Sequence, residues 1–253
     1  MHGTLHSFFS SSRTLPRPFA TSKDIRDRGS LFVAHIFAAS SPKDAHSSIK
    51  HLKHVEHGSR PATHEIAAWR CMVLKPGSTG LCGPDDFELK YGYDDDGEKW
   101  AGNRVLKVMQ DLAVIDAVVI VSRWCVWAPL HVLSTLITLP LHHSRYGGVL
   151  LGPARFTHIE TCAEEVCREF KKSEQLQDCV TTLTSLDDLL GELRTQLQKW
   201  SNPSAQTDKE NAFKKPDYST LDIPKAKRLI AARENSIKSC KCLLAKHQAP
   251  RTS

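Results

Sequence analysis

The sequence predicts an α+β fold, in which a two-layer sheet-and-helix domain is followed by a pair of C-terminal helices. Runs rich in β-branched and aromatic residues, which are typical of strands, alternate with segments whose apolar residues recur every three or four positions. Apolar residues make up 40% of the 253-residue chain and charged residues 25%, as in ordinary globular proteins. This composition excludes a wholly disordered chain, a collagen-like repeat and a polytopic membrane protein.

The elements of the domain alternate in type along the chain. An apolar run follows Gly29 directly, and Ser41 before Pro42 is a typical helix start. Strands are expected at 30–38, 64–74, 87–92 and 115–122, and helices at 42–56, 101–113 and 153–171. The first helix and its end carry four histidines, which are interpreted as a solvated face rather than as metal ligands. They are His46, His51, His54 and His57.

The C-terminal part shows helical spacing alone. Ser185 and Asp188 form a capping-box-like start, and apolar residues then follow at spacings of four and three. We expect a helix at 183–200, a linker at 201–219 and a basic helix at 222–246. The seams are Leu186, Leu190, Leu193, Leu197 and Trp200 in the first helix and Ile230, Ile237 and Leu244 in the second. The two helices are expected to close into an antiparallel hairpin; the alternative is that one seam docks a partner.

The positive charge lies in the tail. Residues 1–195 hold 22 Lys+Arg against 23 Asp+Glu, whereas residues 196–253 hold 12 against 5. Such a tail is either a solvated basic helix or a surface for nucleic acid, the ribosome or an acidic partner.

The first 24 residues are expected to be a flexible leader. Two other interpretations stay open: a mitochondrial transit peptide, since no acidic residue precedes Asp24, and a sliding-clamp-binding pattern in which His2 replaces the usual Gln. The eight cysteines show neither a disulfide framework nor zinc-ligand spacing, so they are expected to be reduced thiols.

The most informative segment is the turn between the third strand and the second helix. Four carboxylates, Asp94, Asp95, Asp96 and Glu98, lie within five residues there. Like charges so close repel each other unless they cap a helix, pair with cations or bind a metal ion.

Five segments together resemble the Impact/YigZ family. They are SLFVAHIF (30–37), ATHEIAAWR (62–70), DDDGEKWAG (94–102), VVIVSRW (118–124) and YGGVLLGPARF (146–156). The resemblance is to a fungal-type member that lacks the leading ubiquitin-conjugating-like (RWD) domain. It implies an Impact-like domain over 25–172, with a small sheet covered by helices on one face, as in domain IV of elongation factor G.

The family's pattern is interrupted after Trp124. In the family the aromatic-Gly-Gly motif follows the Arg-aromatic pair directly, whereas here residues 125–145 intervene and contain no Asp, Glu or Lys. Joining Trp124 to Tyr146 would restore the motif, which suggests a retained short intron or an error in the gene model. Detection in cells of a peptide from 125–145 would refute this hypothesis.

Thirteen residues are candidates for a binding or structural motif. They are His64, Arg70, Asp95, Asp96, Gly97, Glu98, Gly102, Arg123, Tyr146, Gly147, Gly148, Gly152 and Arg155. The glycines are expected to shape turns, while Asp96 and Glu98 cap backbone or pair with Arg123 or Arg155. No catalytic residue, metal site or cofactor is predicted, because phosphate-binding loops, nucleophile elbows and zinc-protease helices are missing from the sequence.

The resemblance implies a cytoplasmic, non-enzymatic regulator of translation under stress. Such proteins compete for the large ribosome-associated activator of the initiation-factor kinase that senses uncharged tRNA, and they also contact monomeric actin. A second interpretation is an RNA- or ribosome-binding protein that uses the α+β domain and the basic tail. A third is a hydrolase that uses the Asp-Asp-Gly-Glu turn with a divalent cation. No membrane partner is expected.

Overall fold

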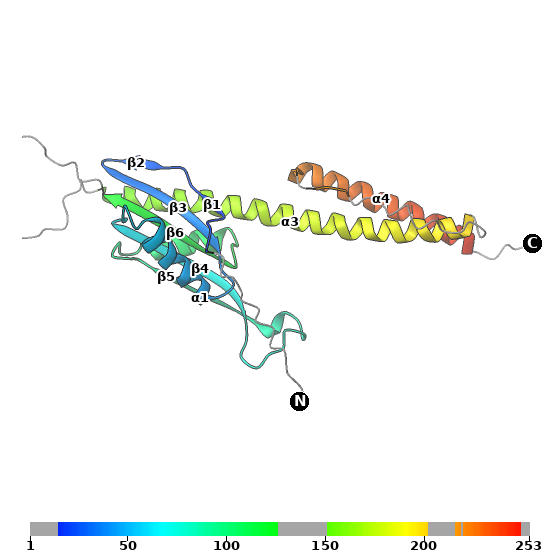
Figure 1. The fold of residues 1–253 in the computed structure, drawn as a ribbon, viewed down its shortest axis with the longest axis horizontal. Helices are drawn as coiled ribbons and strands as arrows, with labels where there is room; N and C mark the ends of the chain where they lie inside the picture. The colour runs from blue at the N-terminus through cyan, green and yellow to red at the C-terminus, as the bar shows by residue number, and fades with distance from the viewer. Residues whose placement is uncertain (1–14, 126–150, 202–215, 219, 249–253) are drawn as a thin grey trace, which may run out of the picture. The chain divides into compact units, whose positions relative to one another are not determined.

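The computed structural model describes residues 15–125, 151–201, 216–218 and 220–248 (Figure 1). Its centre is an antiparallel sheet in the order β1-β3-β6-β4-β5, with β2 paired beside β1 on β3. The strands are β1 (Ala20–Thr21), β2 (Ile25–Asp27), β3 (Ser30–Ala38), β4 (His64–Leu74), β5 (Phe87–Asp94) and β6 (Ala117–Cys125). The expected strands are therefore all present. Two short strands were not expected: β1 lies within the stretch 1–24 that was expected to be a flexible leader, and β2 lies at the start of the expected domain.

The middle of the sheet is buried on both faces. Strand β3 pairs with β6 over nine residues, from Ser30 opposite Cys125 to Ala38 opposite Ala117. Adjacent residues of β3 enter opposite cores: Ile36 packs on one face and Phe37 on the other, and both are essentially inaccessible to solvent. Apolar side chains on both faces require a cover on each.

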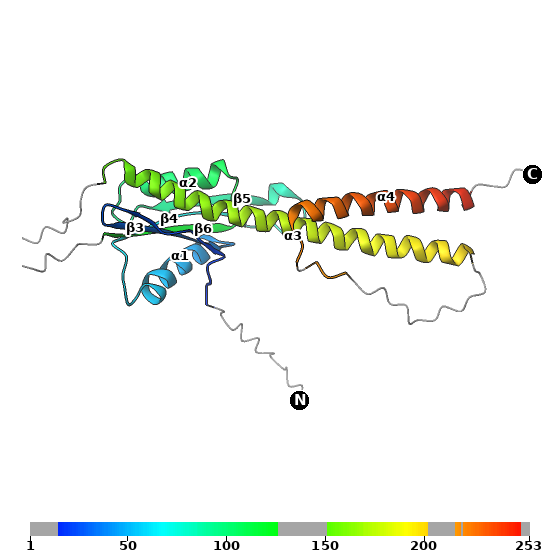
Figure 2. The same cartoon turned by 90° about the horizontal axis from the view of Figure 1, so that it is seen from above.

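Helices supply this cover from both sides (Figure 2). One face packs against α2 (Ala101–Asp111) and the start of α3 (Ala154–Ser201), through Val105, Met109 and Ile159. The other face packs against α1 (Pro42–His51) and the π-helical turn Leu52–Glu56, through Ala45 and Leu52. The predicted α+β class is confirmed. The expected cover of helices on one face only differs from the structure, because β3, β4 and β6 are apolar on both faces.

Two helices expected between residues 153 and 200 are one continuous helix. α3 runs from Ala154 to Ser201, through the stretch 172–182 that separates the expected helices. That stretch contains neither Gly nor Pro, so nothing in it ends a helix. Its Cys179 is buried beside Leu183.

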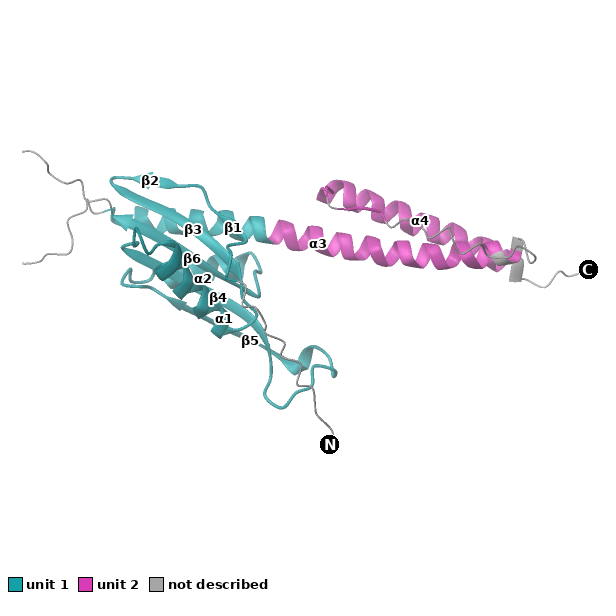
Figure 3. Cartoon of the chain, in the orientation of Figure 1, with its two compact units in different colours: residues 1–170 teal, residues 171–253 magenta. Residues whose placement is uncertain are grey.

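The chain divides into two compact units, residues 1–170 and 171–253 (Figure 3). In the second unit, the C-terminal part of α3 packs against α4 (Ile223–Gln248), which confirms the expected helical pair. The contacts between the two helices move in the same direction along both: Leu183 packs with Ile230, and Leu190, seven residues later, packs with Ile237. The ion pair of 2.5 Å between Asp187 and Arg233 lies between these contacts in sequence.

The two helices therefore run parallel, and the predicted antiparallel direction was wrong. The 21 residues between Ser201 and Ile223 can span about 70 Å when extended. Because Leu183 lies with Ile230, the start of α4 lies roughly 25 residues back along α3, a distance of about 38 Å. The chain is thus long enough to start α4 back along α3. The expected linker 201–219 lies mostly outside the described residues.

Candidate functional site

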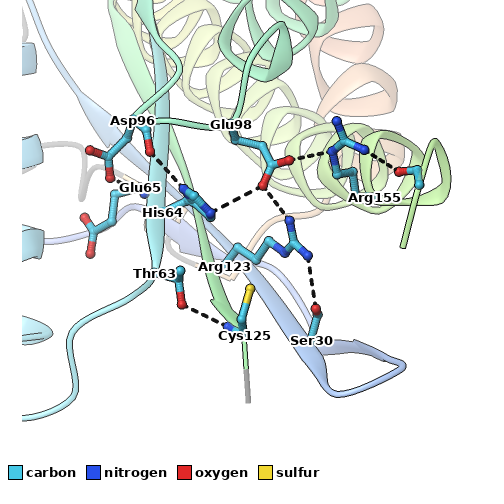
Figure 4. Close-up of polar contacts among 10 residues, drawn as sticks. Ser30, Thr63, His64, Glu65, Asp96, Glu98, Arg123, Cys125 and Arg155 are labelled. Carbon is cyan, nitrogen blue, oxygen red and sulfur yellow. Dashed lines mark hydrogen bonds and ion pairs between the residues drawn. The ribbon is translucent and has the colours of Figure 1, made fainter. Parts of the chain in front are cut away.

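Three side chains, those of His64, Arg123 and Arg155, meet the carboxylate of Glu98 at the turn before α2 (Figure 4). Arg123 Nη1 lies 2.5 Å from Glu98 Oε2, and Arg155 Nε lies 2.5 Å from Glu98 Oε1. His64 Nε2 lies 3.6 Å from Glu98 Oε2. Glu98 is 7% exposed and Arg123 8%. We call these four residues the Glu98 cluster.

Strand register brings three distant segments to this cluster. His64 is the first residue of β4 and pairs directly with Arg123 near the end of β6. Along β6, Val119, Val121 and Arg123 alternate with residues of the opposite face, so Arg123 points to the side covered by α2 and α3. Arg155 comes from the first turn of α3. Arg123 Nη2 also donates to Ser30 Oγ at 3.3 Å.

The carboxylates of the turn are engaged separately. Asp95 accepts from the backbone N–H of Trp100 at 3.1 Å and of Gly102 at 2.8 Å, which caps the start of α2. Asp94 Oδ1 accepts from the N–H of Asp96 at 3.0 Å. The like charges of the turn thus tolerate each other because each is neutralised or hydrogen-bonded by a different group.

Asp96 joins the turn to β4 and to the end of the first helix. Its Oδ2 accepts from the N–H of Glu65 at 2.7 Å, and its Oδ1 lies 3.1 Å from Lys53 Nζ. Its carbonyl oxygen accepts from His64 Nδ1 at 2.9 Å, which fixes the orientation of the imidazole. Asp96 therefore contacts Lys53, whereas Glu98 alone contacts the two arginines.

Three of the candidate glycines shape this backbone. Gly97 and Gly152 have φ angles of +86° and +56°, in the left-handed region that glycine adopts without a steric penalty. The carbonyl of Gly152 accepts from Arg155 Nη1 at 2.7 Å. At Gly102 a Cβ atom would lie 2.8 Å from the carbonyl oxygen of Asp94, so only glycine allows this approach of α2 to β5.

The remaining candidates do not join the cluster. Arg70 Nη1 donates to the carbonyls of Met109 and Val114 at 3.1 and 2.9 Å, and so binds the C-terminal end of α2. Tyr146, Gly147 and Gly148 lie outside the described residues, as does the intervening segment apart from Cys125.

Several contact residues were not singled out from the sequence. Ser30 binds Arg123 and lies at the start of a quoted segment of the resemblance, whereas Lys53, which binds Asp96, lies in none of them. The guanidinium groups of Arg104 and Arg155 stack on the ring of Phe156, with their Cζ atoms 4.4 and 4.2 Å from the ring centroid. The Arg-Phe pair at 155–156 belongs to a quoted segment of the resemblance, which was the available signal for Phe156.

A second polar group is buried on the α1 side of the sheet. His57 Nδ1 lies 2.8 Å from Glu65 Oε1, and Glu65 is 2% exposed. The rings of His35 and His57 lie 5.7 Å apart. Burial, and secondarily the charge of His57, lowers the pKa of His35 to about 4. The interpretation of His57 as a solvated residue was wrong, because Glu65 draws it onto the sheet.

The geometry gives little support to metal-dependent chemistry at the turn. Asp94, Asp95 and Asp96 bind different backbone groups instead of converging on one point. In the parts of the chain that the structure describes, no three His, Cys, Asp or Glu residues are grouped in a way that could hold a metal ion. The described helices also include none that is long and apolar enough to cross a membrane.

The chain is similar over about three fifths of its length to curated vertebrate proteins. It is 32% identical over 154 residues to Protein IMPACT-A of Xenopus tropicalis, which covers 61% of this chain and 38% of that one. It is 34% identical over 145 residues to Protein IMPACT of Bos taurus, covering 57% and 36%. It is 32% identical over 145 residues to Protein IMPACT of Homo sapiens, which covers 57% of this chain and 35% of that one. The chain thus spans less than two fifths of the length of these relatives.

A solved structure titled as that of a hypothetical protein is 20% identical to the chain, with a TM-score of 0.37, and the match covers 61% of this chain and 58% of that one. Residues 28–132 match the model of the Impact N-terminal domain. This range contains four of the five segments that carried the resemblance, which is thereby confirmed. Over residues 28–132 the chain is thus similar to the Impact N-terminal domain, and over a comparable length to the curated IMPACT proteins.

Proposed function

We propose that this protein is a non-enzymatic regulator of translation under stress, which acts by binding another protein. The partner that the family resemblance implies is the large ribosome-associated activator of the initiation-factor kinase. Monomeric actin is the second partner that it implies. Such a role would place the protein in the cytoplasm.

The observation that carries the proposal is the division of polar and apolar groups in the turn before α2. Two of its carboxylates are engaged within the protein, where Glu98 holds two arginines and Asp95 holds backbone N–H groups. Its largest apolar side chain points outward, since Trp100 is 72% exposed. A catalytic site would be expected to keep a charged group free for substrate, whereas an exposed tryptophan is typical of the residues that dominate protein interfaces.

Trp100 is also held in place before a partner arrives. Its φ angle is +75°, in the left-handed region that a bulky residue rarely adopts. The hydrogen bond of its N–H to Asp95 at 3.1 Å fixes this conformation. A backbone that is already fixed loses less entropy on binding, which favours affinity.

The test is a pull-down of a purified activator fragment. We expect the wild-type protein to retain the fragment at micromolar concentration, and Trp100→Ala to weaken binding about tenfold or more. Trp200→Ala is the matched control, because Trp200 is also exposed, at 55%, but lies in the second unit. Absence of retention by the wild type would contradict the regulatory role. Equal retention by Trp100→Ala would remove Trp100 from the interface.

The basic surface of α4 favours a second candidate function, the binding of RNA or ribosome. Six exposed cations lie on this helix, against the single acidic residue Glu234. They are Lys225, Lys227, Arg228, Lys238, Lys241 and Lys246. Binding to phosphates would weaken steeply as salt rises, and Lys238→Ala with Lys241→Ala should reduce the salt slope by about two. RNA binding that ignores ionic strength would contradict this candidate.

A further inference from the structure

The strand β5 is an open edge of the sheet in the described part of the chain. It pairs with β4 on one side, and the sheet order ends there. Its residues Phe87, Leu89 and Tyr91 are all exposed, Tyr91 at 62%. Met72 and Leu74 lie opposite Leu89 and Phe87 on β4 and are exposed as well. Together these five residues form an apolar ladder beside an unpaired edge, which natural sheets usually protect.

The backbone groups of the same β5 residues point away from β4. Lys75 N–H donates to the carbonyl of Asp86 at 2.8 Å, so this pair, next after Leu74 and Phe87, is a hydrogen-bonded one. In an antiparallel ladder such pairs alternate with pairs that are not hydrogen-bonded. Phe87, Leu89 and Tyr91 therefore direct their N–H and C=O groups outward. Met72, opposite Leu89, accordingly donates its N–H to Asp116 at 2.7 Å instead of to β5.

We propose that β5 pairs with β5 of a second copy of this chain, antiparallel and centred on Leu89. In this register Leu89 faces Leu89, and Phe87 faces Tyr91 of the second copy. Glu88 then faces Lys90 of the second copy, and the same contact recurs on the other side of the twofold axis. Hydrogen bonds from Phe87, Leu89 and Tyr91 of each copy join the two sheets into one.

Charge complementarity favours a second copy of the chain as the partner of β5, in the register centred on Leu89. A ladder centred on Lys90 would place Lys90 against Lys90, and one centred on Tyr91 would place Glu88 against Asp94. Only centring on Leu89 puts both Glu88 and Lys90 opposite an unlike charge. Within one copy, Lys90 Nζ already lies 3.1 Å from Glu88 Oε1, so pairing would create a group of four alternating charges. The turn Pro84–Asp86 ends the strand just before Phe87, which limits the paired segment to 87–91.

Charge reversal provides the test, with the full chain studied by sedimentation equilibrium over a concentration series. The wild type should shift from 28.3 kDa towards twice that mass as its concentration rises. Glu88→Lys alone places like charges opposite each other at two positions per dimer, as does Lys90→Glu alone. Each should weaken dimerisation about tenfold. The double variant, Glu88→Lys with Lys90→Glu, should dimerise like the wild type.

Mixing the two single variants separates a lost interface from a lost fold. Glu88→Lys carries two positive charges on this face and Lys90→Glu carries two negative ones, so an equimolar mixture should form heterodimers although each alone stays largely monomeric. Unfolded variants would not regain association in this way. A wild type that is monomeric up to submillimolar concentration would overturn the proposal. A dimer that neither single variant weakens would place the contact elsewhere and would overturn it equally.

Discussion

Glu98 and Arg123 are joined by an ion pair of 2.5 Å between two side chains that are both more than nine-tenths buried. Taking both charges out of water is costly, so the pair by itself adds little to stability. The pair matters when one partner is removed, because the other charge is then left buried without a counter-charge or water to solvate it. Arg155 on the same carboxylate extends this dependence to α3.

We therefore expect Glu98→Gln to lower the free energy of unfolding by about 3 kcal/mol, because it leaves two guanidinium groups without their common carboxylate. Glu160→Gln is the control. It removes an equally close pair, 2.7 Å from Arg104, whose side chains are 35% and 45% exposed, and should cost less than about 1 kcal/mol. Urea unfolding of both variants measures the difference. Similar losses in the two variants would show that the burial of Glu98 has no special effect.

Alanine should have opposite effects on stability at two helical glycines, Gly102 in α2 and Gly191 in α3, because only Gly102 lies against a neighbouring strand. At Gly102 the new Cβ would meet the backbone of Asp94 and the ring of Tyr93, at 2.8 and 2.9 Å. Backbone cannot move aside cheaply, so Gly102→Ala should destabilise the protein by about 2 kcal/mol despite the better helix propensity of alanine.

At Gly191 in α3 nothing lies within 4 Å of an added Cβ. Gly191→Ala should therefore raise stability by up to about 1 kcal/mol, through helix propensity alone. Thermal melting of both variants checks the pair of predictions. A stable Gly102→Ala protein would show that glycine at this position is not needed for the contact between helix and strand.

The regular elements could be predicted because their signals are local. The apolar runs of β3 and β4 gave the bounds 30–38 and 64–74 that the structure has. The direction of α4 could not be predicted, since Ile230, Ile237 and Leu244 repeat every seven residues in either direction along a partner helix. The direction follows only from which residues meet: Leu183 lies with Ile230 and Leu190 with Ile237, so the contacts advance in the same sense along both helices.

The Glu98 cluster could be predicted only in part from the sequence, for a similar reason. Glu98 and Arg123 lie in recognisable motifs, whereas their geometry depends on the register that sets His64 opposite Arg123. Lys53 gave no signal, because a lysine near a helix end is usually solvated. His57 was misassigned because its partner, Glu65, lies in a strand whose other residues are mostly apolar. In both cases the missing information was a long-range contact.

The buried His35 predicts a loss of stability in mild acid. Burial, and secondarily the nearby His57, lowers the pKa of His35 to about 4 in the folded protein, against 6.5 for an exposed histidine. The unfolded chain therefore binds a proton that the folded protein does not. The free energy of unfolding therefore keeps its full value above pH about 6.5 and decreases, by up to about 3 kcal/mol, as the pH drops to about 4.

The variant His35→Leu removes this titration. Its unfolding free energy should change less than that of the wild type between the two ends of the pH range, measured by urea unfolding at each. His57 and Glu65 face the same position and are kept in both proteins, so the difference isolates His35. Identical pH dependence in the two proteins would exclude His35 as its source.

The cysteines predict a graded pattern of thiol reactivity. All eight are free, with Cys82 and Cys242 exposed and Cys71, Cys162, Cys167 and Cys179 buried. Burial raises the pKa of Cys71 and Cys162 to about 11 and that of Cys167 to about 12. Alkylation requires the thiolate, so a rise of two pKa units alone slows it about a hundredfold near neutral pH, and exclusion of the reagent slows it further.

Iodoacetamide should thus modify Cys82 and Cys242 in the native protein long before Cys71, Cys162 and Cys167, as peptide mass spectrometry can follow site by site. In denaturant all five should react at similar rates, which is the control for intrinsic differences between the peptides. Native labelling of Cys167 at the rate of Cys82 would mean that the face of the sheet covered by α3 opens readily, since Cys167 is packed there with Cys162 and Val166. Protection of Cys162 and Cys167 would show that the start of α3 stays closed on the sheet over the time of the reaction.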